Sequence, residues 1–247
     1  MRIALLADVH ANREALEACL HHARLNGVEK YVFLGDLVGY GADPEWVLET
    51  VIDLSQQGAI AVLGNHDAAV FNGAERTMHE DAQSVAAWTR SRIAPAQREF
   101  LAGLPLFHES SDSLYVHANA WKPGRWEYVA TTTDARRSLD TTLCRFTFCG
   151  HLHVPALYHQ GTLGGVAHFA PVAGVGIPLG AHHRWLAVLG AVGQPRDGNP
   201  AACYAIHDLA RKQLTFHRVP YDVETAARKI REAGLPAWLG SRLETGA

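Results

Sequence analysis

Five short segments of this sequence combine carboxylate, imidazole and amide side chains, and each follows an apolar stretch. They are Asp8-Val9-His10, Gly35-Asp36, Gly64-Asn65-His66-Asp67, His117 and Gly150-His151-Leu152-His153. A donor set of oxygen and nitrogen without a thiolate suits manganese, iron, zinc or nickel better than it suits a structural zinc finger. The donors are too many for one metal ion. The pattern therefore predicts a site for two.

Taken alone, each segment is a weak signal. An Asp at the end of a strand is usually part of a turn or a helix cap, and Gly64-Asn65 is also typical of a turn. His151 and His153 are a stronger pair, because residues two apart in an extended chain point to the same side. All five segments in this order, each after an apolar strand, make coincidence a poor explanation.

The apolar stretches predict a parallel sheet that gathers these polar groups at one edge. Strands are expected at 2–7, 31–34 and 59–63. The helices between them begin after Asn12 and after Asp43, and Pro44 stands in the first turn of the second helix. This alternation is typical of a parallel sheet, whose ligands bind outside the carboxyl ends of the strands.

The rest of the chain predicts a mixed architecture. Residues 76–103 read as a helical insertion of one or two helices, followed by a hairpin over 106–117 and an aromatic loop over 118–130. Further strands are expected at 146–149 and within 156–219, and a closing helix begins near Asp222. No linker or repeat interrupts the chain, so residues 1–247 are predicted to form a single domain.

Composition excludes several classes of protein. The 247 residues carry 22 Lys and Arg against 25 Asp and Glu, a net charge of −3, without the basic stripe expected of a nucleic-acid-binding protein. No apolar run approaches the length of about 18 residues needed for a membrane span. Cys19, Cys144, Cys149 and Cys203 match no zinc or redox spacing. Buried free thiols and a cytoplasmic location are therefore expected.

The ordered motifs D-x-H, G-D, G-N-H-[DE], H and G-H-x-H, complete between residues 8 and 153, resemble the calcineurin-like metallophosphoesterase superfamily. The run Gly193-Gln194-Pro195-Arg196 is similar to a segment of its small bacterial phosphodiesterase branch. The resemblance implies an α/β fold in four layers, an α/β/β/α sandwich of two mixed sheets flanked by helices. It also implies a dinuclear metal site at the strand ends.

The resemblance also implies a role for each motif residue. Asp8, His10 and His153 would bind one metal ion, Asn65, His117 and His151 the other, and Asp36 would bridge both. A hydroxide between the ions would attack phosphorus, and His66 would protonate the leaving group as general acid. Asp67 is a candidate for orienting the His66 ring. The cofactors would be two divalent transition metal ions, with manganese favoured and iron, zinc or nickel as alternatives.

One motif departs from the phosphoprotein phosphatases, which read G-D-x-V-D-R-G. Gly39 and Tyr40 stand here where those enzymes carry an aspartate and a phosphate-binding arginine. Symmetrical dinucleoside-tetraphosphate hydrolases also keep that arginine, so both activities are disfavoured. Arg196 or Arg125 could supply the phosphate contact from elsewhere in the chain.

Several aromatic side chains lie in the loops that should surround the site. They could stack on a nucleotide base, although packing against the core is the commoner role of such residues: His79, Tyr40, Trp121, Trp126 and Tyr128. The predicted function is therefore a phosphodiesterase that acts on a small nucleotide-type substrate, as a monomer or a homo-oligomer. A phosphomonoesterase or protein phosphatase is the alternative enzyme. A protein-binding module on the same fold is the alternative of another class, which the intact set of ligands and His66 disfavours.

Overall fold

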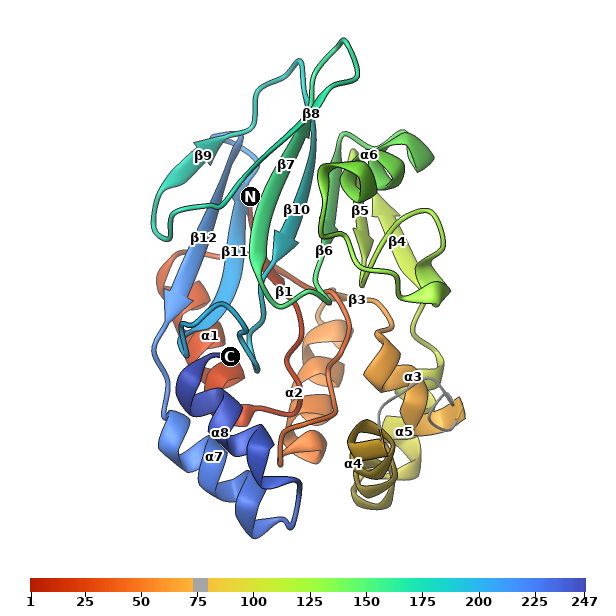
Figure 1. Ribbon diagram of the computed structural model, residues 1–247, viewed down its shortest axis with the longest axis vertical. Helices are drawn as coiled ribbons and strands as arrows, with labels where there is room; N and C mark the ends of the chain where they lie inside the picture. Colours follow the sequence, from red (N-terminus) through yellow and green to blue (C-terminus); the bar gives the residue numbers. More distant parts are fainter. Residues whose placement is uncertain (73–79) are drawn as a thin grey trace.

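The computed structural model describes residues 1–72 and 80–247, which build two six-stranded sheets that face each other (Figure 1). Sheet A has the order β3 (Ile60–Ala61), β2 (Lys30–Phe33), β1 (Arg2–Leu6), β11 (Ala202–Asp208), β12 (Gln213–Val219) and β9 (Gly176–Pro178). Sheet B has the order β4 (Phe107–Ser110), β5 (Ser113–Val116), β6 (Phe146–Cys149), β10 (Arg184–Leu189), β7 (Pro155–Gln160) and β8 (Val166–Phe169).

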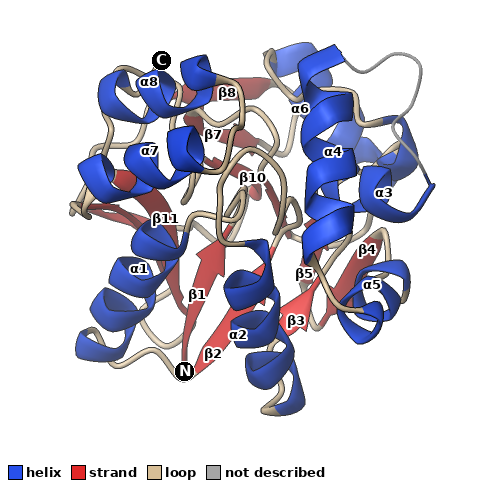
Figure 2. Ribbon diagram, turned by 90° about the horizontal axis from the view of Figure 1, so that it is seen from below, coloured by secondary structure: helices blue, strands red, loops and turns tan. Residues whose placement is uncertain are grey.

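Helices cover the outer face of each sheet, which confirms the predicted four-layer α/β/β/α sandwich. α1 (Arg13–Leu25) and α2 (Pro44–Gln56) pack on sheet A (Figure 2) through an apolar cluster that includes Leu16 and Val47. α6 (Thr132–Thr141) packs on sheet B through Leu139. A third apolar cluster lies between the sheets, where Leu5 of sheet A and Phe148 of sheet B are both buried. Burial of these apolar faces is the main stabilising term of the fold.

Each sheet contains three neighbouring parallel strands, and these strands carry the functional motifs. β1, β2 and β3 are parallel in sheet A, with Leu5 paired to Val32 and Val32 to Ile60. β5, β6 and β10 are parallel in sheet B, with Tyr115 paired to Phe148. The carboxyl ends of all six strands lie at the lower end of the molecule in Figure 1.

The helix starts predicted after Asn12 and Asp43 are confirmed. The side chain of Asn12 caps α1 by accepting a hydrogen bond of 3.1 Å from the Ala15 N–H. Asp43 precedes α2 but makes no capping bond, because its carboxylate accepts instead from Lys229 Nζ of a distant helix. β3 is shorter than the predicted strand over 59–63.

The helical insertion is confirmed and begins earlier than expected. α3 (Asn65–Asn72) starts inside the third motif, and α4 (Glu80–Arg92) and α5 (Pro95–Ala102) follow it. Residues 76–79 of the predicted insertion lie outside the described residues. The aromatic loop contains one 3-10 turn, η1 (Pro123–Arg125), and leads into α6.

The chain closes with two helices rather than one, α7 (Val223–Glu232) and α8 (Ala237–Thr245). The α7–α8 hairpin lies at the same end of the molecule as α3, α4 and α5 (Figure 1). Val85 of α4 shares an apolar cluster with Ile230 and Leu239 of the hairpin, so these helices meet beside the strand ends. Among the helices of the described residues, none combines the length and the apolar character that crossing a membrane requires.

Candidate metal centre

The side chains predicted as metal ligands converge at the carboxyl ends of β1, β2, β3, β5 and β6. They form two groups that share Asp36, and in each group the ligand atoms lie within 4.8 Å of one another: Asp8, His10, Asp36 and His153, and Asp36, His117 and His151. Asn65 joins the second group through its Oδ1, which lies 3.1 Å from His117 Nε2. All but Asn65 are buried.

Asp36 lies between the two groups. Its Oδ2 is 3.6 Å from His10 Nε2 on one side and 3.4 Å from His117 Nε2 on the other. His10 Nε2 is also 3.2 Å from His153 Nε2. His117 Nε2 is 3.1 Å from His151 Nδ1. The arrangement gives each group its own set of donors and one carboxylate in common.

The outward ring nitrogen of each imidazole in the centre faces a backbone carbonyl. His10 Nδ1 lies 3.2 Å from the Val38 oxygen, and His117 Nδ1 lies 2.7 Å from the Leu34 oxygen. His153 Nδ1 lies 2.6 Å from the Gln194 oxygen. His151 is turned the other way, with Nε2 at 2.8 Å from the Trp126 oxygen. A carbonyl can only accept, so these outward nitrogens carry the ring protons.

The inward atoms are consequently acceptors. When the rings are neutral, as metal ligation requires, the inward nitrogens present lone pairs to one another, to the carboxylates and to the Asn65 oxygen. Lone pairs about 3 Å apart repel unless a cation lies among them. The residues therefore fit two divalent metal ions of the nitrogen- and oxygen-binding kind. This fit rests on the donor chemistry of the cluster.

The charges of the cluster shift the pKa values of its members in opposite directions. Burial alone would raise the pKa of Asp36, but the surrounding imidazoles, His117 first, hold it well below its usual range. Burial lowers the pKa of His151 to about 3 and that of His10 well below its ordinary value. Burial would also lower the pKa of His117, but the Asp36 carboxylate outweighs it and raises that pKa to about 9. Without a metal ion, His117 therefore carries a second proton on its inward Nε2, beside Asp36, and metal binding would release that proton.

Backbone strain is concentrated in the same residues. Among the described residues, ten other than glycine have a positive φ, and five of these are predicted ligands: Asp8, His10, Asp36, His151 and His153. Residues other than glycine adopt a positive φ only at an energetic cost, which the surrounding structure must offset. Strain of this kind gathers at functional sites, because sharp turns aim side chains that a regular strand would point elsewhere.

Backbone N–H groups hold the two carboxylates in place. Asp36 Oδ1 accepts from the His66 N–H at 2.9 Å, and Asp8 Oδ2 accepts from the His151 N–H at 2.9 Å. The first of these bonds requires glycine at the start of the third motif. A Cβ on Gly64 would lie 2.2 Å from Asp36 Oδ1, so no other residue fits there without displacing the carboxylate.

His66 lies beside the centre, outside both groups of predicted ligands. Its ring is 5.1 Å from that of His10 and 4.3 Å from that of Tyr40, centroid to centroid. Burial lowers its pKa, and nearby imidazoles reinforce the shift against the Asp36 carboxylate. The prediction that Asp67 orients this ring is wrong. The Asp67 carboxylate accepts from the backbone N–H groups of Val38 and Gly64 instead, and burial raises its pKa to about 7.

Aromatic side chains of two loops flank the centre. Tyr128 stacks on His151 at 4.3 Å, and Trp126 meets the His117 ring edge-on at 5.8 Å. Tyr40 lies 4.6 Å from the His10 ring on the opposite side of the cluster. Trp121 instead packs against α6, where Arg137 lies over its ring. His79 lies outside the described residues.

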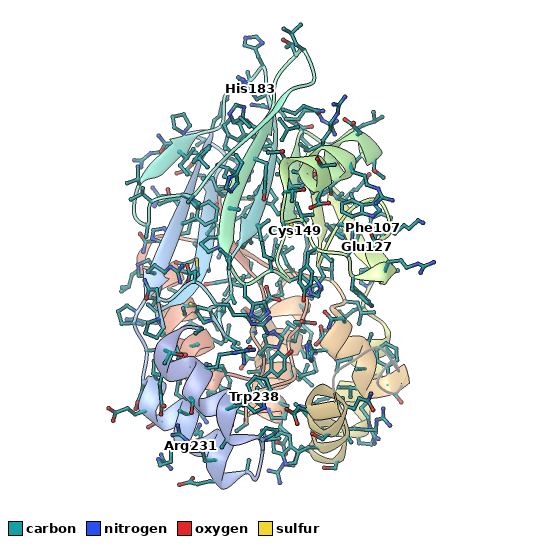
Figure 3. All side chains as sticks on the ribbon, viewed as in Figure 1. Phe107, Glu127, Cys149, His183, Arg231 and Trp238 are labelled. Carbon is teal, nitrogen blue, oxygen red and sulfur yellow. The ribbon has the colours of Figure 1, made fainter. Side chains whose placement is uncertain are left out.

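Two contributors near the site were not predicted. Gln194 supplies the carbonyl that orients His153, and it falls in the Gly-Gln-Pro-Arg run that the sequence had already marked. Trp238 of α8 lies 6.5 Å from Tyr40 and donates to Asp81 of α4 at 2.8 Å. Figure 3 shows Trp238 at the lower end of the molecule, among the helices beside the strand ends. No local signal distinguishes it from an ordinary helix residue.

Comparisons with known proteins agree with this geometry. A family model described as the calcineurin-like phosphoesterase superfamily domain matches residues 1–212. An uncharacterized protein of Methanocaldococcus jannaschii is 34% identical over 259 aligned positions, which cover 99% of this chain and 98% of that protein. A crystal structure of a metallophosphoesterase from Sphaerobacter thermophilus is 35% identical, with a TM-score of 0.88 over 100% of this chain and 99% of that one.

A second solved structure is similar in fold alone. It is that of a hypothetical protein from Pyrococcus horikoshii OT3, 18% identical, with a TM-score of 0.79 over 100% of this chain and 98% of that one. The α7–α8 hairpin lies beyond the matched residues 1–212, yet both solved structures cover the whole chain.

Proposed function

Because this chain belongs to the calcineurin-like phosphoesterase superfamily and is a metal-dependent phosphoesterase, we propose that it hydrolyses phosphodiesters, with a small nucleotide-type compound as substrate. The observation that carries the catalytic part is the cluster of inward-facing acceptors around Asp36. Such a cluster suits two cations, and cations bound there would be able to polarise the phosphoryl group of a substrate.

The residues of the centre would divide the two ions as the motifs imply. Asp8, His10 and His153 would hold one, Asn65, His117 and His151 the other, and Asp36 both. When bound, the ions would supply Lewis-acid charge for the phosphoryl oxygens and acidify the water that attacks phosphorus. Asp36 would lessen the repulsion between the two dications, and the neutral Asn65 amide would avoid cancelling too much of their charge.

His66 would protonate the leaving oxygen of the ester. Its ring adjoins His10 without belonging to the predicted ligand set, so it is free to face the substrate. No carboxylate stands at position 39 to support this ring, as one does in the phosphoprotein phosphatases. This difference favours a substrate whose leaving oxygen is less basic and depends less on protonation by His66.

The aromatic rings beside the centre support the proposal of a nucleotide-type substrate. Tyr128 is 49% exposed while it stacks on His151, so one face of its ring is available beside the centre. Tyr40 stands on the other side of the cluster. A planar base or aryl group attached to the reacting phosphate could stack on either ring.

A rate comparison tests the proposal. Protein stripped of metal and reloaded with Mn²⁺ should cleave bis-p-nitrophenyl phosphate faster than p-nitrophenyl phosphate, and a chelator should abolish both rates. Faster cleavage of the monoester would support the phosphomonoesterase alternative instead. No turnover of either compound by protein holding two metal ions would favour a non-catalytic binding module.

We further propose that the enzyme works in the cytoplasm on a diffusible phosphoester. All four cysteines are free and buried, and burial alone raises the thiol pKa of Cys19. Unpaired thiols of this kind are compatible with a reducing compartment. Manganese is the proposed metal on the basis of the donor set, which iron, zinc or nickel would also fit.

A further inference from the structure

Arg196 follows β10 and lies directly beside the metal centre. Its backbone N–H donates to the His153 carbonyl at 3.2 Å. Its Nε and Nη2 both donate to Gln194 Oε1, at 3.2 and 2.8 Å. The carbonyl of the same Gln194 accepts from His153 Nδ1. The Arg196 side chain is therefore held by the very residue that orients a predicted metal ligand.

The guanidinium of Arg196 reaches toward the centre over the ring of Tyr40. Its Cζ lies 5.7 Å from the centroid of that ring. Tyr40 in turn contacts the rings of His10 and His66, at 4.6 and 4.3 Å. Tyr40 thus contacts Arg196, the predicted general acid and a predicted metal ligand, and the charge of Arg196 helps to lower the pKa of both histidines.

This positive charge has no carboxylate partner. In residues 1–72 and 80–247, Arg196 forms no ion pair within 4.0 Å, and its two hydrogen bonds to Gln194 end on a neutral amide oxygen. Arg242 of α8 stands nearby and lies over the Trp238 ring at 4.7 Å, again without an ion pair among those residues. Burial lowers the pKa of Arg242, and the charge of Arg196 lowers it further. Two neighbouring cations that lack counter-ions favour an anion between or beside them.

We propose that Arg196 binds the phosphoryl oxygens of the substrate, and so restores from the loop after β10 the guanidinium that phosphoprotein phosphatases carry at the position of Tyr40. The inference rests on the proposed function, since it requires a phosphoester at the centre. Its chemistry is that of a charge-assisted, bidentate contact between a guanidinium and a phosphate. Gln194 and Tyr40 hold the side chain in place beforehand, which reduces the entropy lost on binding.

Arg125, the other arginine considered for this role, lacks such support. It ends η1 within the aromatic loop, and it is exposed. Within the described part of the chain, no hydrogen bond or ion pair holds its guanidinium. It is therefore a matched control, an arginine near the site that nothing orients toward it.

The test is the binding of inorganic phosphate to the Mn²⁺-loaded protein, measured by calorimetry. Arg196→Met should weaken phosphate binding by about 10- to 100-fold, the usual loss when a hydrogen-bonded charge is removed. Arg196→Lys keeps the positive charge but loses the planar guanidinium, so its phosphate affinity should fall between those of the natural protein and Arg196→Met. Arg125→Met should stay within about twofold of the natural protein. With bis-p-nitrophenyl phosphate, Arg196→Met should raise KM by a similar factor.

The outcomes separate this proposal from the function on which it rests. If Arg196→Met and Arg196→Lys bind phosphate as tightly as Arg125→Met does, Arg196 is not a phosphate ligand, even where the enzyme is an active phosphodiesterase. If the natural protein cleaves neither ester yet loses phosphate binding with Arg196→Met, the phosphate site stands and the catalytic proposal fails. Should Arg196→Met fold poorly, Arg196→Lys decides, because an affinity equal to that of the natural protein overturns the bidentate contact.

Discussion

Asp36 is the single residue on which the two halves of the metal centre depend. Its Oδ2 lies between His10 and His117, and its Oδ1 is held by the His66 N–H. The positive φ of 52° at Asp36 shows that the chain accepts strain to place it there. A carboxylate in this position acts on both predicted ions, whereas Asp8 faces only one group.

Asp36→Asn should therefore lose both metal ions, because the neutral amide cannot offset the repulsion between two dications. Asp8→Asn, its matched comparison, should lose the ion held with His10 and His153 and keep the other. Metal content per chain after dialysis, measured by elemental analysis, distinguishes the two variants. An Asp36→Asn protein that keeps two ions would rule out the bridge.

His66→Ala should keep both metal ions and lose rate, since His66 lies outside the predicted ligand set. General acid catalysis contributes about 10²- to 10⁴-fold, and the loss should be largest for an alkyl ester whose leaving oxygen needs a proton. A p-nitrophenyl ester should be affected much less. Equal losses of kcat on the two esters would contradict a role in protonating the leaving group.

Gly39 leaves the space in which the His66 ring lies. A Cβ at this position would stand 2.9 Å from His66 Nδ1, and its φ is +90°. Gly39→Ala should therefore displace the ring and reduce kcat on poor leaving groups, as His66→Ala does. Gly58→Ala is the control, because Gly58 has a φ of +97° and nothing within 4 Å of a Cβ.

Both glycine variants should lose about 1–2 kcal/mol of stability, since both force a side chain into the left-handed region. Urea unfolding measures that loss, and steady-state kinetics measures the change in kcat. If the two variants lose the same fraction of activity, backbone strain rather than contact with His66 is the cause.

At the scale of elements, Lys229 joins α7 to α1 and to the start of α2 through hydrogen bonds to two carboxylates. Its Nζ donates to Glu14 of α1 and, at 3.0 Å, to Asp43 at the start of α2. The Lys229 side chain is 27% exposed, so water screens these charges only in part. The same hairpin carries Trp238, whose ring lies 6.5 Å from that of Tyr40, and Arg242, which lies over the Trp238 ring.

Lys229→Met should lower the free energy of unfolding by about 2 kcal/mol, because two carboxylates lose the cation between them. Arg228→Met is the matched control on the same helix. Within residues 1–72 and 80–247, the ion pair of Arg228 is with Glu232 one turn away, and its side chain is 55% exposed, so its loss should change stability by no more than about 0.5 kcal/mol. Urea unfolding of the two variants decides, and equal destabilisation would show that the anchor contributes nothing beyond a surface pair.

At the scale of the whole molecule, the interior contains a histidine that links stability to pH. His207 of β11 is 1% exposed, packs against Phe146 and Phe148 from sheet B, and has an Nδ1 without a hydrogen-bond partner among the described residues. Burial lowers its pKa from 6.5 to about 4. It lies near the start of β1, paired with Ile3, far from the metal centre at the end of that strand.

The sign of the effect follows from the depressed pKa. As the pH falls below about 6.5, the unfolded chain binds a proton at His207 that the folded chain refuses until about pH 4. Stability should therefore fall by about 2 kcal/mol between pH 7.5 and pH 5 on account of this residue. His207→Leu should remove that part of the pH dependence, whereas His182→Leu, at an exposed position, should leave it unchanged. Parallel pH profiles of the His207→Leu and natural proteins would contradict the prediction.

The two sheets share one interior cluster, and α4 from the middle of the chain packs with α7 and α8 from its carboxyl-terminal part. On this basis we propose that residues 1–247 unfold as a single domain. The urea curves of the variants above should then show one transition, with fluorescence and circular dichroism coinciding.

Much of this architecture could be predicted because its signals are local. Apolar runs, an Asn cap and Pro44 specify their own strands and helices, so the parallel strands and the positions of the motifs follow from a few neighbouring residues. The short β3, the start of α3 at Asn65 and the second closing helix were not predicted. In these places tertiary contacts outweigh a weak local pattern.

The sequence by itself determined which residue types lie at the strand ends, and the order of its motifs indicated the calcineurin-like phosphoesterase family. Only the tertiary structure decided how those residues are used: which nitrogen of each imidazole faces the centre, that Asp67 turns to the backbone, and that Arg196 lies over Tyr40. The partners in these contacts come from distant parts of the chain, as with His10 and His153, which are 143 positions apart. Side-chain contacts between distant segments depend on how two sheets pack, and no local pattern encodes that packing.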